Sequence, residues 1–213
     1  MSKNVAVVAR YLGGALALAV IVGVVQLALF ADVVVMHNSV GEISITEFIQ
    51  EAFLFITALL FLRIALKWRE HRGGYLLIAG FFFCLLIREM DFFLDNIVHG
   101  CWLYFAVLCT VVCVGFALTS LKNTFAGLAH FLQHYSYHYM VGGLLTVLVF
   151  SRLFGMNALW AALMDDGYIR AVKNLAEEGA ELYGYTLCLI AGVLYTRHTS
   201  SCMGLGSATH AVR

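Results

Sequence analysis

Residues 11–31 form an apolar run without a single charge, and this feature most limits how the chain can fold. About 20 such residues in a helix cross the hydrocarbon core of a bilayer. Similar segments recur along the chain, so that 62% of its residues are hydrophobic and only 12% are charged. Soluble domains contain about 45–50% apolar and about 25% charged residues. The sequence therefore predicts an integral membrane protein.

Six segments are long and apolar enough to be read as membrane-spanning helices. They are residues 11–31, 47–66, 75–98, 101–120, 139–154 and 180–196. The first exceeds the 7–15 apolar residues of a signal peptide, and no small-x-small cleavage site follows it, so we expect an uncleaved span. The connections are short. We therefore predict a single transmembrane domain, an all-α bundle of six helices.

The distribution of basic residues predicts the orientation, because short cytoplasmic loops carry an excess of Lys and Arg. With the N-terminus inside, nine of the 13 basic residues are cytoplasmic and four lie on the other side. The four are Arg88, Arg152, Arg170 and Lys173. The sequence thus predicts that both termini are inside, and compact loops without an N-x-S/T sequon favour a bacterial inner membrane.

The third segment carries the charges that point to a functional site. Its uninterrupted apolar part, residues 75–87, is too short to cross a bilayer, so the helix is expected to continue through the charges that follow. At about 100° per residue, Arg88, Asp91, Asp95 and His99 share one helical face, and Glu89 lies about 100° away. A charge at mid-bilayer costs roughly 2.5–3.5 kcal/mol, so these groups need partners or water. We expect Arg88 to pair with Asp91.

Acidic residues of two other segments lie at a similar depth. The second segment offers Glu47 and Glu51, and the sixth begins near Glu177, Glu178 and Glu181. If the three helices converge, they form an acidic pocket on the outer side. The candidate substrate- or ion-binding residues are Glu51, Arg88, Glu89, Asp91, Asp95, Glu178 and Glu181. The structural alternatives are an ion pair that only fixes helix packing and acidic helix N-termini that complement the helix dipole.

Two sets of residues are candidate metal ligands. Asp95 and His99, four residues apart, share a helical face and are joined in this hypothesis by Glu51 and Glu181. On the inner side, His130, His134 and His138 follow one another at four-residue spacing and form one ridge if the segment is helical. Such a ridge is also typical of a histidine and aromatic belt at the membrane interface. The sequence identifies no cofactor, and the candidate that it offers is a divalent metal ion.

Small residues and cysteines are explained by packing. The glycine pair at 142–143 and the stripe of Gly184, Tyr185, Cys188 and Gly192 after Glu181 suit close helix contacts. The six cysteines include no C-x-x-C pair, and buried free thiols are expected. A formal net charge of zero without a basic domain excludes nucleic acid as a partner. The expected partners are membrane lipids, and either further copies of this chain or the other subunits of a membrane complex.

These patterns leave three functional hypotheses open, and they do not decide whether the chain is an enzyme. The leading hypothesis is a small transporter or cation-binding protein with an outward-facing carboxylate, Arg and His site. The alternative is a metal-dependent enzyme in the membrane that acts on a lipid or headgroup at the outer leaflet, with Arg88 holding a phosphate or carboxylate. The third is an accessory subunit whose buried charges set helix registry.

Overall fold

The computed structural model describes residues 3–38, 40, 43–95 and 99–210, with side chains up to residue 200. The described residues form helices and no strand, which confirms the all-α prediction. The α-helices are α1 (Lys3–Phe30), α2 (Ile45–Lys67), α3 (Arg72–Glu89), α4 (Asp91–Asp95), α5 (Cys101–Leu118), α6 (Leu121–Leu132), α7 (Ser136–Leu145), α8 (Ser151–Phe154), α9 (Asn157–Met164) and α10 (Arg170–His210). Short π or 3-10 helices, η1 (Ala31–Val35), η2 (Arg69–His71), η3 (Thr146–Phe150) and η4 (Asp165–Gly167), join or extend them.

Five stretches among the described residues are long and apolar enough to cross a membrane, which supports the prediction of an integral membrane protein. They are Lys3–Val35, Ile45–Lys67, Arg69–Glu89, Cys101–Leu118 and Ser136–Phe154. The sixth predicted segment, 180–196, lies within α10, a helix of 41 residues that is not one of the five. Six spans and the inside location of both termini stay predictions.

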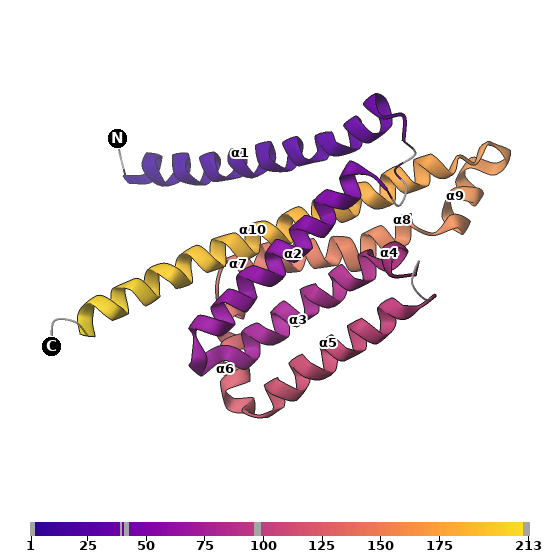
Figure 1. Ribbon diagram of the computed structural model, residues 1–213. Helices are drawn as coiled ribbons and strands as arrows, with labels where there is room; N and C mark the ends of the chain where they lie inside the picture. The colour runs from indigo at the N-terminus through magenta and orange to yellow at the C-terminus, as the bar shows by residue number, and fades with distance from the viewer. Residues whose placement is uncertain (1–2, 39, 41–42, 96–98, 211–213) are drawn as a thin grey trace.

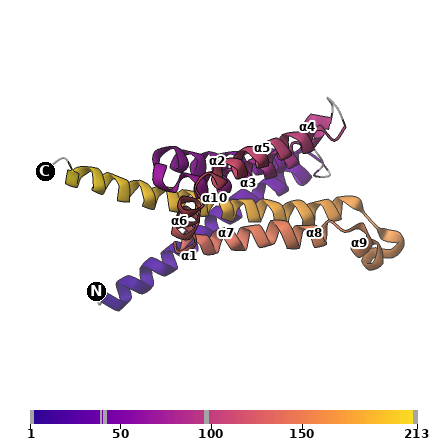
Figure 2. The ribbon, with the colours of Figure 1, turned by 90° about the horizontal axis from the view of Figure 1, so that it is seen from below.

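The helices lie side by side with α10 in a central position. α10 packs against α1, α2, α7 and α8, whereas α3 packs against α2, α5 and α6. Figure 1 shows both termini at one end of the bundle and α4, α8 and α9 at the other end. Figure 2 shows that α2, α3 and α5 form one layer and that α7 and α8 lie with α10 in a second. We call the end with α4, α8 and α9 the charged end, and the opposite end, which carries α6, the histidine end.

Close contact between α7 and α10 depends on two glycines that face each other. A Cβ atom at Gly143 would lie 2.5 Å from the carbonyl oxygen of Gly184, and one at Gly184 would lie 2.7 Å from that of Gly143. Both atoms belong to backbone, which cannot move aside as a flexible side chain does. These two positions place α7 and α10 as near to each other as small residues allow in membrane helices.

The start of α2 is fixed by a carboxylate from the end of the first helix. Asp32, which is fully buried, accepts hydrogen bonds from the backbone N–H groups of Ile45 and Thr46 at 2.9 and 2.8 Å. Ser44 also caps the helix, because its Oγ accepts from the N–H of Glu47 at 3.1 Å. These bonds satisfy donors that have no partner within the helix and hold η1 against the charged end of α2.

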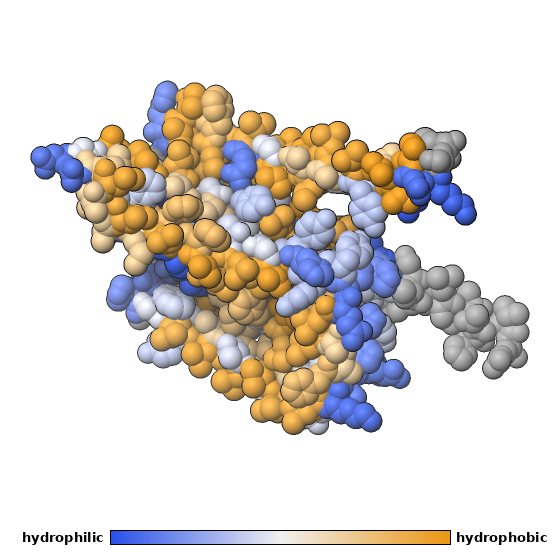
Figure 3. All heavy atoms as spheres, turned by 180° about the vertical axis from the view of Figure 1, so that it is seen from behind, coloured by the Kyte–Doolittle hydropathy of each residue, from blue (hydrophilic) through white to orange (hydrophobic). Residues whose placement is uncertain are grey.

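The outer surface is largely apolar along the helices. In Figure 3, hydrophobic residues cover the length of the bundle and hydrophilic residues gather mainly towards its ends. Large side chains on α1 and α5 are widely exposed, for example Leu16 and Leu108 at 67% and 61%. An exposed apolar surface of this extent suits contact with lipid rather than water.

Candidate functional site

The charged stretch after residue 87 is not one continuous helix, which corrects the sequence prediction. α3 ends at Glu89, Met90 has non-helical backbone angles (φ −81°, ψ 14°), and α4 is a separate helix of five residues. The common face predicted for residues 88–99 is therefore interrupted after Arg88 and Glu89. Residues 96–98, the last of the predicted third span, lie outside the described residues.

Asp95 and His99 lie beyond this break, apart from the other candidates. Asp95 Oδ1 accepts a hydrogen bond from the N–H of Gly100 at 2.9 Å, and its Oδ2 lies 3.1 Å from His99 Nδ1. The His99 side chain is 98% exposed. Asp95 thus closes the turn before α5, where Gly100 adopts the left-handed conformation (φ 76°) that suits glycine. Neither residue lines the cavity described next.

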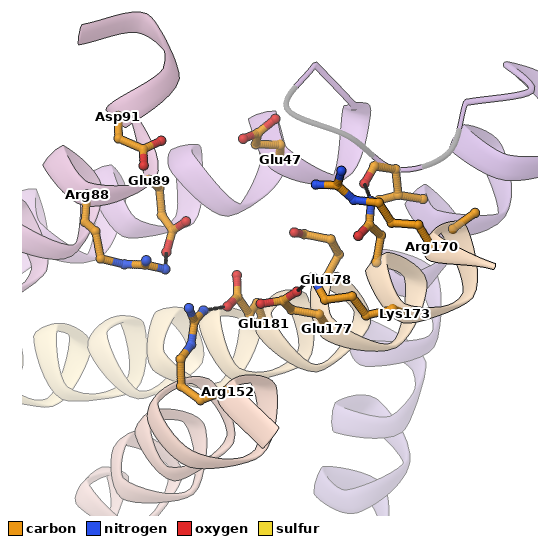
Figure 4. A pocket seen from close by; sticks show the side chains of 13 residues that line it. Glu47, Arg88, Glu89, Asp91, Arg152, Arg170, Lys173, Glu177, Glu178 and Glu181 are labelled. Carbon is orange, nitrogen blue, oxygen red and sulfur yellow. Dashed lines mark hydrogen bonds and ion pairs between the residues drawn. The ribbon is translucent and has the colours of Figure 1, made fainter. Parts of the chain in front are cut away.

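A cavity of about 580 Å³ lies at the charged end, between the ends of α3 and α8 and the start of α2 and α10. Figure 4 shows charged side chains from these helices around it. Its charged lining residues are Glu47, Arg88, Glu89, Asp91, Arg152, Arg170, Lys173, Glu177, Glu178 and Glu181. Six carboxylates thus face four cationic groups. The structure brings together Arg88, Glu89, Asp91, Glu178 and Glu181 from the predicted set.

Three ion pairs join opposite charges around the cavity. Arg88 lies 3.0 Å from Glu89, which is therefore its partner in place of the predicted Asp91. The exposed Asp91 belongs to α4, on the far side of the helix break. Arg152 at the end of the fifth span pairs with Glu181, which is 3% exposed, and Lys173 lies 2.9 Å from Glu177 within α10. Pairing with an opposite charge offsets part of the free-energy cost of removing these groups from water.

Arg152 was not predicted as a site residue. The sequence placed it on the outer side, but its position relative to Glu181 depends on the packing of α8 against α10. Only its depth in the span, similar to that of Glu181, could have indicated the contact.

Glu178 differs from the paired carboxylates because its side chain is hydrogen-bonded by an amide. Gln50 Nε2 donates to Glu178 Oε2 and to the Glu178 carbonyl oxygen, both at 3.1 Å. Glu178 precedes the predicted sixth span. Burial, and then the negative charges of Glu89 and Glu177, raise its pKa to about 7. This carboxyl group can therefore gain or lose a proton near neutral pH.

Glu51 lies one turn after Glu47 on α2 but does not line the cavity. Its Oε1 atom is buried and has no hydrogen-bond partner among the described residues. Buried carboxylate oxygens without a partner are costly, so such an atom is a place for a proton, a water or a cation. Glu51 therefore remains a candidate next to the cavity.

The predicted metal ligands are not brought together. Glu181 is paired with Arg152 and Asp95 with His99, whereas the buried Oε1 of Glu51 has no hydrogen-bond partner among the described residues. Within residues 3–200, apart from the undescribed gaps, no group of three or more His, Cys, Asp or Glu side chains is arranged to hold a metal ion.

The inner histidines also differ from the predicted ridge. α6 ends at Leu132 and α7 begins at Ser136, so His134 lies in a turn between the two helices. His130 Nδ1 lies 2.7 Å from the hydroxyl of Tyr195, whereas His138 is exposed and contacts the backbone of Tyr135.

Two histidines from other elements join this group instead. The ring centroids of His71 and His130 are 6.2 Å apart, and those of His134 and His198 are 4.6 Å apart. Burial lowers the pKa of His130 and His134, and the neighbouring His71 and His198 lower it further. His130 and His134 therefore resist protonation more than an exposed histidine does.

No protein family model, curated protein or solved structure matches this chain. The functional argument therefore depends on the cavity and its charges.

Proposed function

We propose that this chain is a small multi-pass membrane protein that binds a cation or a cationic small solute in the cavity at its charged end and carries it across the membrane. The observation that supports this proposal is that Glu178 has no cationic partner among the ion pairs of the cavity. Its side chain faces an amide, in a cavity where six carboxylates meet four cationic groups. With every group ionised, the cavity has an excess of two negative charges. An added cation neutralises part of that excess without breaking an existing ion pair.

The position of Glu51 supports the same function. Its buried, unpartnered Oε1 lies in α2 one turn further from the charged end than Glu47, which lines the cavity. Carboxylates within membrane helices are rare and commonly belong to proton or ion pathways. We propose that Glu178 is the first carboxylate that a cation meets and that Glu51 is the next along the path.

Binding is tested on the purified protein in detergent. A cation that binds only the folded state raises its stability in proportion to the logarithm of one plus the ratio of concentration to Kd. We expect Na⁺, K⁺, Mg²⁺ or Ca²⁺ chloride to raise the melting temperature, relative to N-methylglucamine chloride at equal ionic strength. The variant E178Q should lose that rise, and E70Q, an exposed carboxylate in η2 at the histidine end, should keep it.

Transport is tested in proteoliposomes that contain a pH-sensitive dye or a dye for the cation found in the binding experiment. Wild type and E70Q should show flux, and E178Q and E51Q should each reduce it at least tenfold. Equal flux in all four proteins would contradict transport through this cavity. Cation-dependent stabilisation without flux in any of them would leave a binding protein and remove the transport function.

We propose further that α10 supplies the sixth span and that both termini are cytoplasmic. We also propose that the membrane is a bacterial inner membrane, in which the chain works as an oligomer or as part of a membrane complex. The basic-residue bias supports this orientation. In it, the cavity opens outside the cell. Single-cysteine variants in a cysteine-free background test the orientation: a membrane-impermeant maleimide should label A171C in intact cells, and S2C only after lysis. The reverse labelling pattern would contradict it.

A further inference from the structure

An apolar crevice lies between α3 and α7, and the proposed binding and transport of a cation do not use it. It consists of two cavities, of about 280 and about 250 Å³. The first is lined by apolar side chains that include Ile78, Phe81, Met140 and Leu144. The second is lined by Leu85, Val147, Leu148 and Tyr185 together with Arg88 and Arg152.

The two cavities follow one another along the same faces of the two helices. On α3, the lining residues Ile78, Phe81, Leu85 and Arg88 recur at intervals of three or four, which places them on one side of the helix. The facing element runs from α7 through η3 to α8, and its lining residues recur in the same way from Met140 to Arg152. The two hollows are therefore successive parts of one crevice.

The length of this crevice matches one leaflet of a bilayer. From Leu77 to Arg88 the lining of α3 extends over 12 residues, and the 11 steps between them at 1.5 Å each give about 16 Å. Half of a hydrocarbon core about 30 Å thick is about 15 Å. Phe81 and Leu148 in its wall are 40% and 48% exposed, so the crevice is open along its side.

The crevice ends at two arginines. Arg88 and Arg152 line both the second cavity of the crevice and the charged cavity. Their side chains are 39% and 44% exposed. Each guanidinium has five N–H donors. The pairs with Glu89 and Glu181 use few of them, so donors remain for a second anion. Arginine binds phosphate well because its planar donors match two oxygens at once.

From this geometry we infer that the crevice binds one anionic phospholipid of the leaflet at the charged end, with an acyl chain between α3 and α7 and the headgroup phosphate at Arg88 and Arg152. An apolar slot one leaflet long that ends at two cations complements such a molecule in both shape and charge. The inference is independent of cation transport, because a bound lipid can equally fix the two layers of helices.

Native mass spectrometry of the delipidated protein, titrated with phosphatidylglycerol or phosphatidylcholine, tests this inference. Wild type should retain one phosphatidylglycerol at a concentration at least tenfold lower than it needs for phosphatidylcholine. L148W fills the crevice and should remove this retention. V149W is the matched control, because Val149 is 55% exposed and does not line the crevice. The charge-neutral double variant R152Q/E181Q should abolish the preference for phosphatidylglycerol.

Labelling of the wild-type protein gives a second test that does not depend on a variant folding. Phosphatidylglycerol with a photoreactive diazirine near the end of its acyl chain should label the peptides containing Phe81 and Met140 above the lipid-exposed face of α5. Uniform labelling of α1, α5 and α7 would overturn the inference. So would a wild-type protein that retains the two lipids equally well, or an L148W variant that retains phosphatidylglycerol as well as wild type does.

Discussion

Tyr185 of α10 donates a hydrogen bond of 2.7 Å to Oε1 of Glu89, the last residue of α3. The same oxygen lies 3.0 Å from Arg88, so Glu89 joins the guanidinium of one helix layer to the hydroxyl of the other. Tyr185 is 1% exposed. A buried neutral donor and an arginine thus hold this carboxylate at the edge of the cavity, and α3 is fixed against α10 at the charged end.

We expect Y185F to lower the free energy of unfolding by about 2 kcal/mol, because a hydrogen bond to a charged group contributes about 1.5–3 kcal/mol. Denaturant titration in a mild detergent measures the change. Y183F is the matched control, since Tyr183 on the same helix is 39% exposed, and its effect should be below about 0.5 kcal/mol. Equal effects of the two variants would contradict the importance of the Glu89 contact.

Removing Arg152 should cost more than removing both members of its pair. R152Q leaves Glu181, which is 3% exposed, without its cation. We expect a loss of about 2 kcal/mol, below the 3–5 kcal/mol of fully buried pairs because Arg152 is 44% exposed. The double variant R152Q/E181Q should recover at least half of this loss. A double-mutant cycle of unfolding free energies tests the coupling, and additive losses would show that the two residues do not interact.

The contact between α7 and α10 predicts a strong effect of one methyl group. G143A places a Cβ atom 2.5 Å from the carbonyl oxygen of Gly184 and should destabilise the protein by about 1–3 kcal/mol through overpacking. G115A, in the last turn of α5 with nothing within 4 Å, should be neutral or stabilising, because alanine favours helix by up to about 1 kcal/mol. Thermal unfolding compares the two, and a neutral G143A would contradict this tight packing.

Much of the helical content was predictable because a long apolar segment, such as residues 11–31, predicts a membrane-spanning helix. The placement of Arg88 and Glu89 near Glu178 also followed from their depth, in the third segment and just before the sixth. The end of α3 did not, since helical periodicity carries no signal for the break at Met90. A helix that continues through Met90 predicts Asp91 as the partner of Arg88.

Contacts between segments distant in sequence could not be predicted from apolar length or helical periodicity. The pair of Arg152 with Glu181 requires a relative placement of α8 and α10 that only their packing determines. The four-residue spacing of His130 and His134 likewise suggested a ridge, but the turn between α6 and α7 breaks it. The partners of these histidines come from other elements, His71 from η2 and His198 from α10.

The histidine end should make the protein less stable in acid. Because burial lowers the pKa of His130 and His134 in the folded state, the unfolded chain binds more protons as the pH falls through about 6.5, and stability is lost. We expect the melting temperature of wild type to fall relative to that of H130N/H134N between pH 7.5 and 5.5. The variant H130N/H134N should reduce this slope, whereas H138N, at an exposed position, should keep it. An unchanged slope in the double variant would assign the acid sensitivity elsewhere.

Glu178 should produce the opposite pH dependence at the charged end. Its pKa is raised to about 7 in the folded state from an ordinary value of 4.5, so the folded protein binds a proton that the unfolded chain lacks between these values. Its contribution to stability is therefore largest below pH 4.5 and is lost as the pH rises through about 7.

E178Q imitates the protonated side chain, and we expect it to exceed wild type in stability at pH 8 by on the order of 2 kcal/mol. A full shift at about 1.4 kcal/mol per pKa unit would give more, but the side chain is partly exposed. The gap should close by pH 4.5, and E70Q should show none at either pH. Unfolding free energies of the three proteins at both pH values decide the matter, because a gap that stays constant with pH would rule out proton uptake by Glu178.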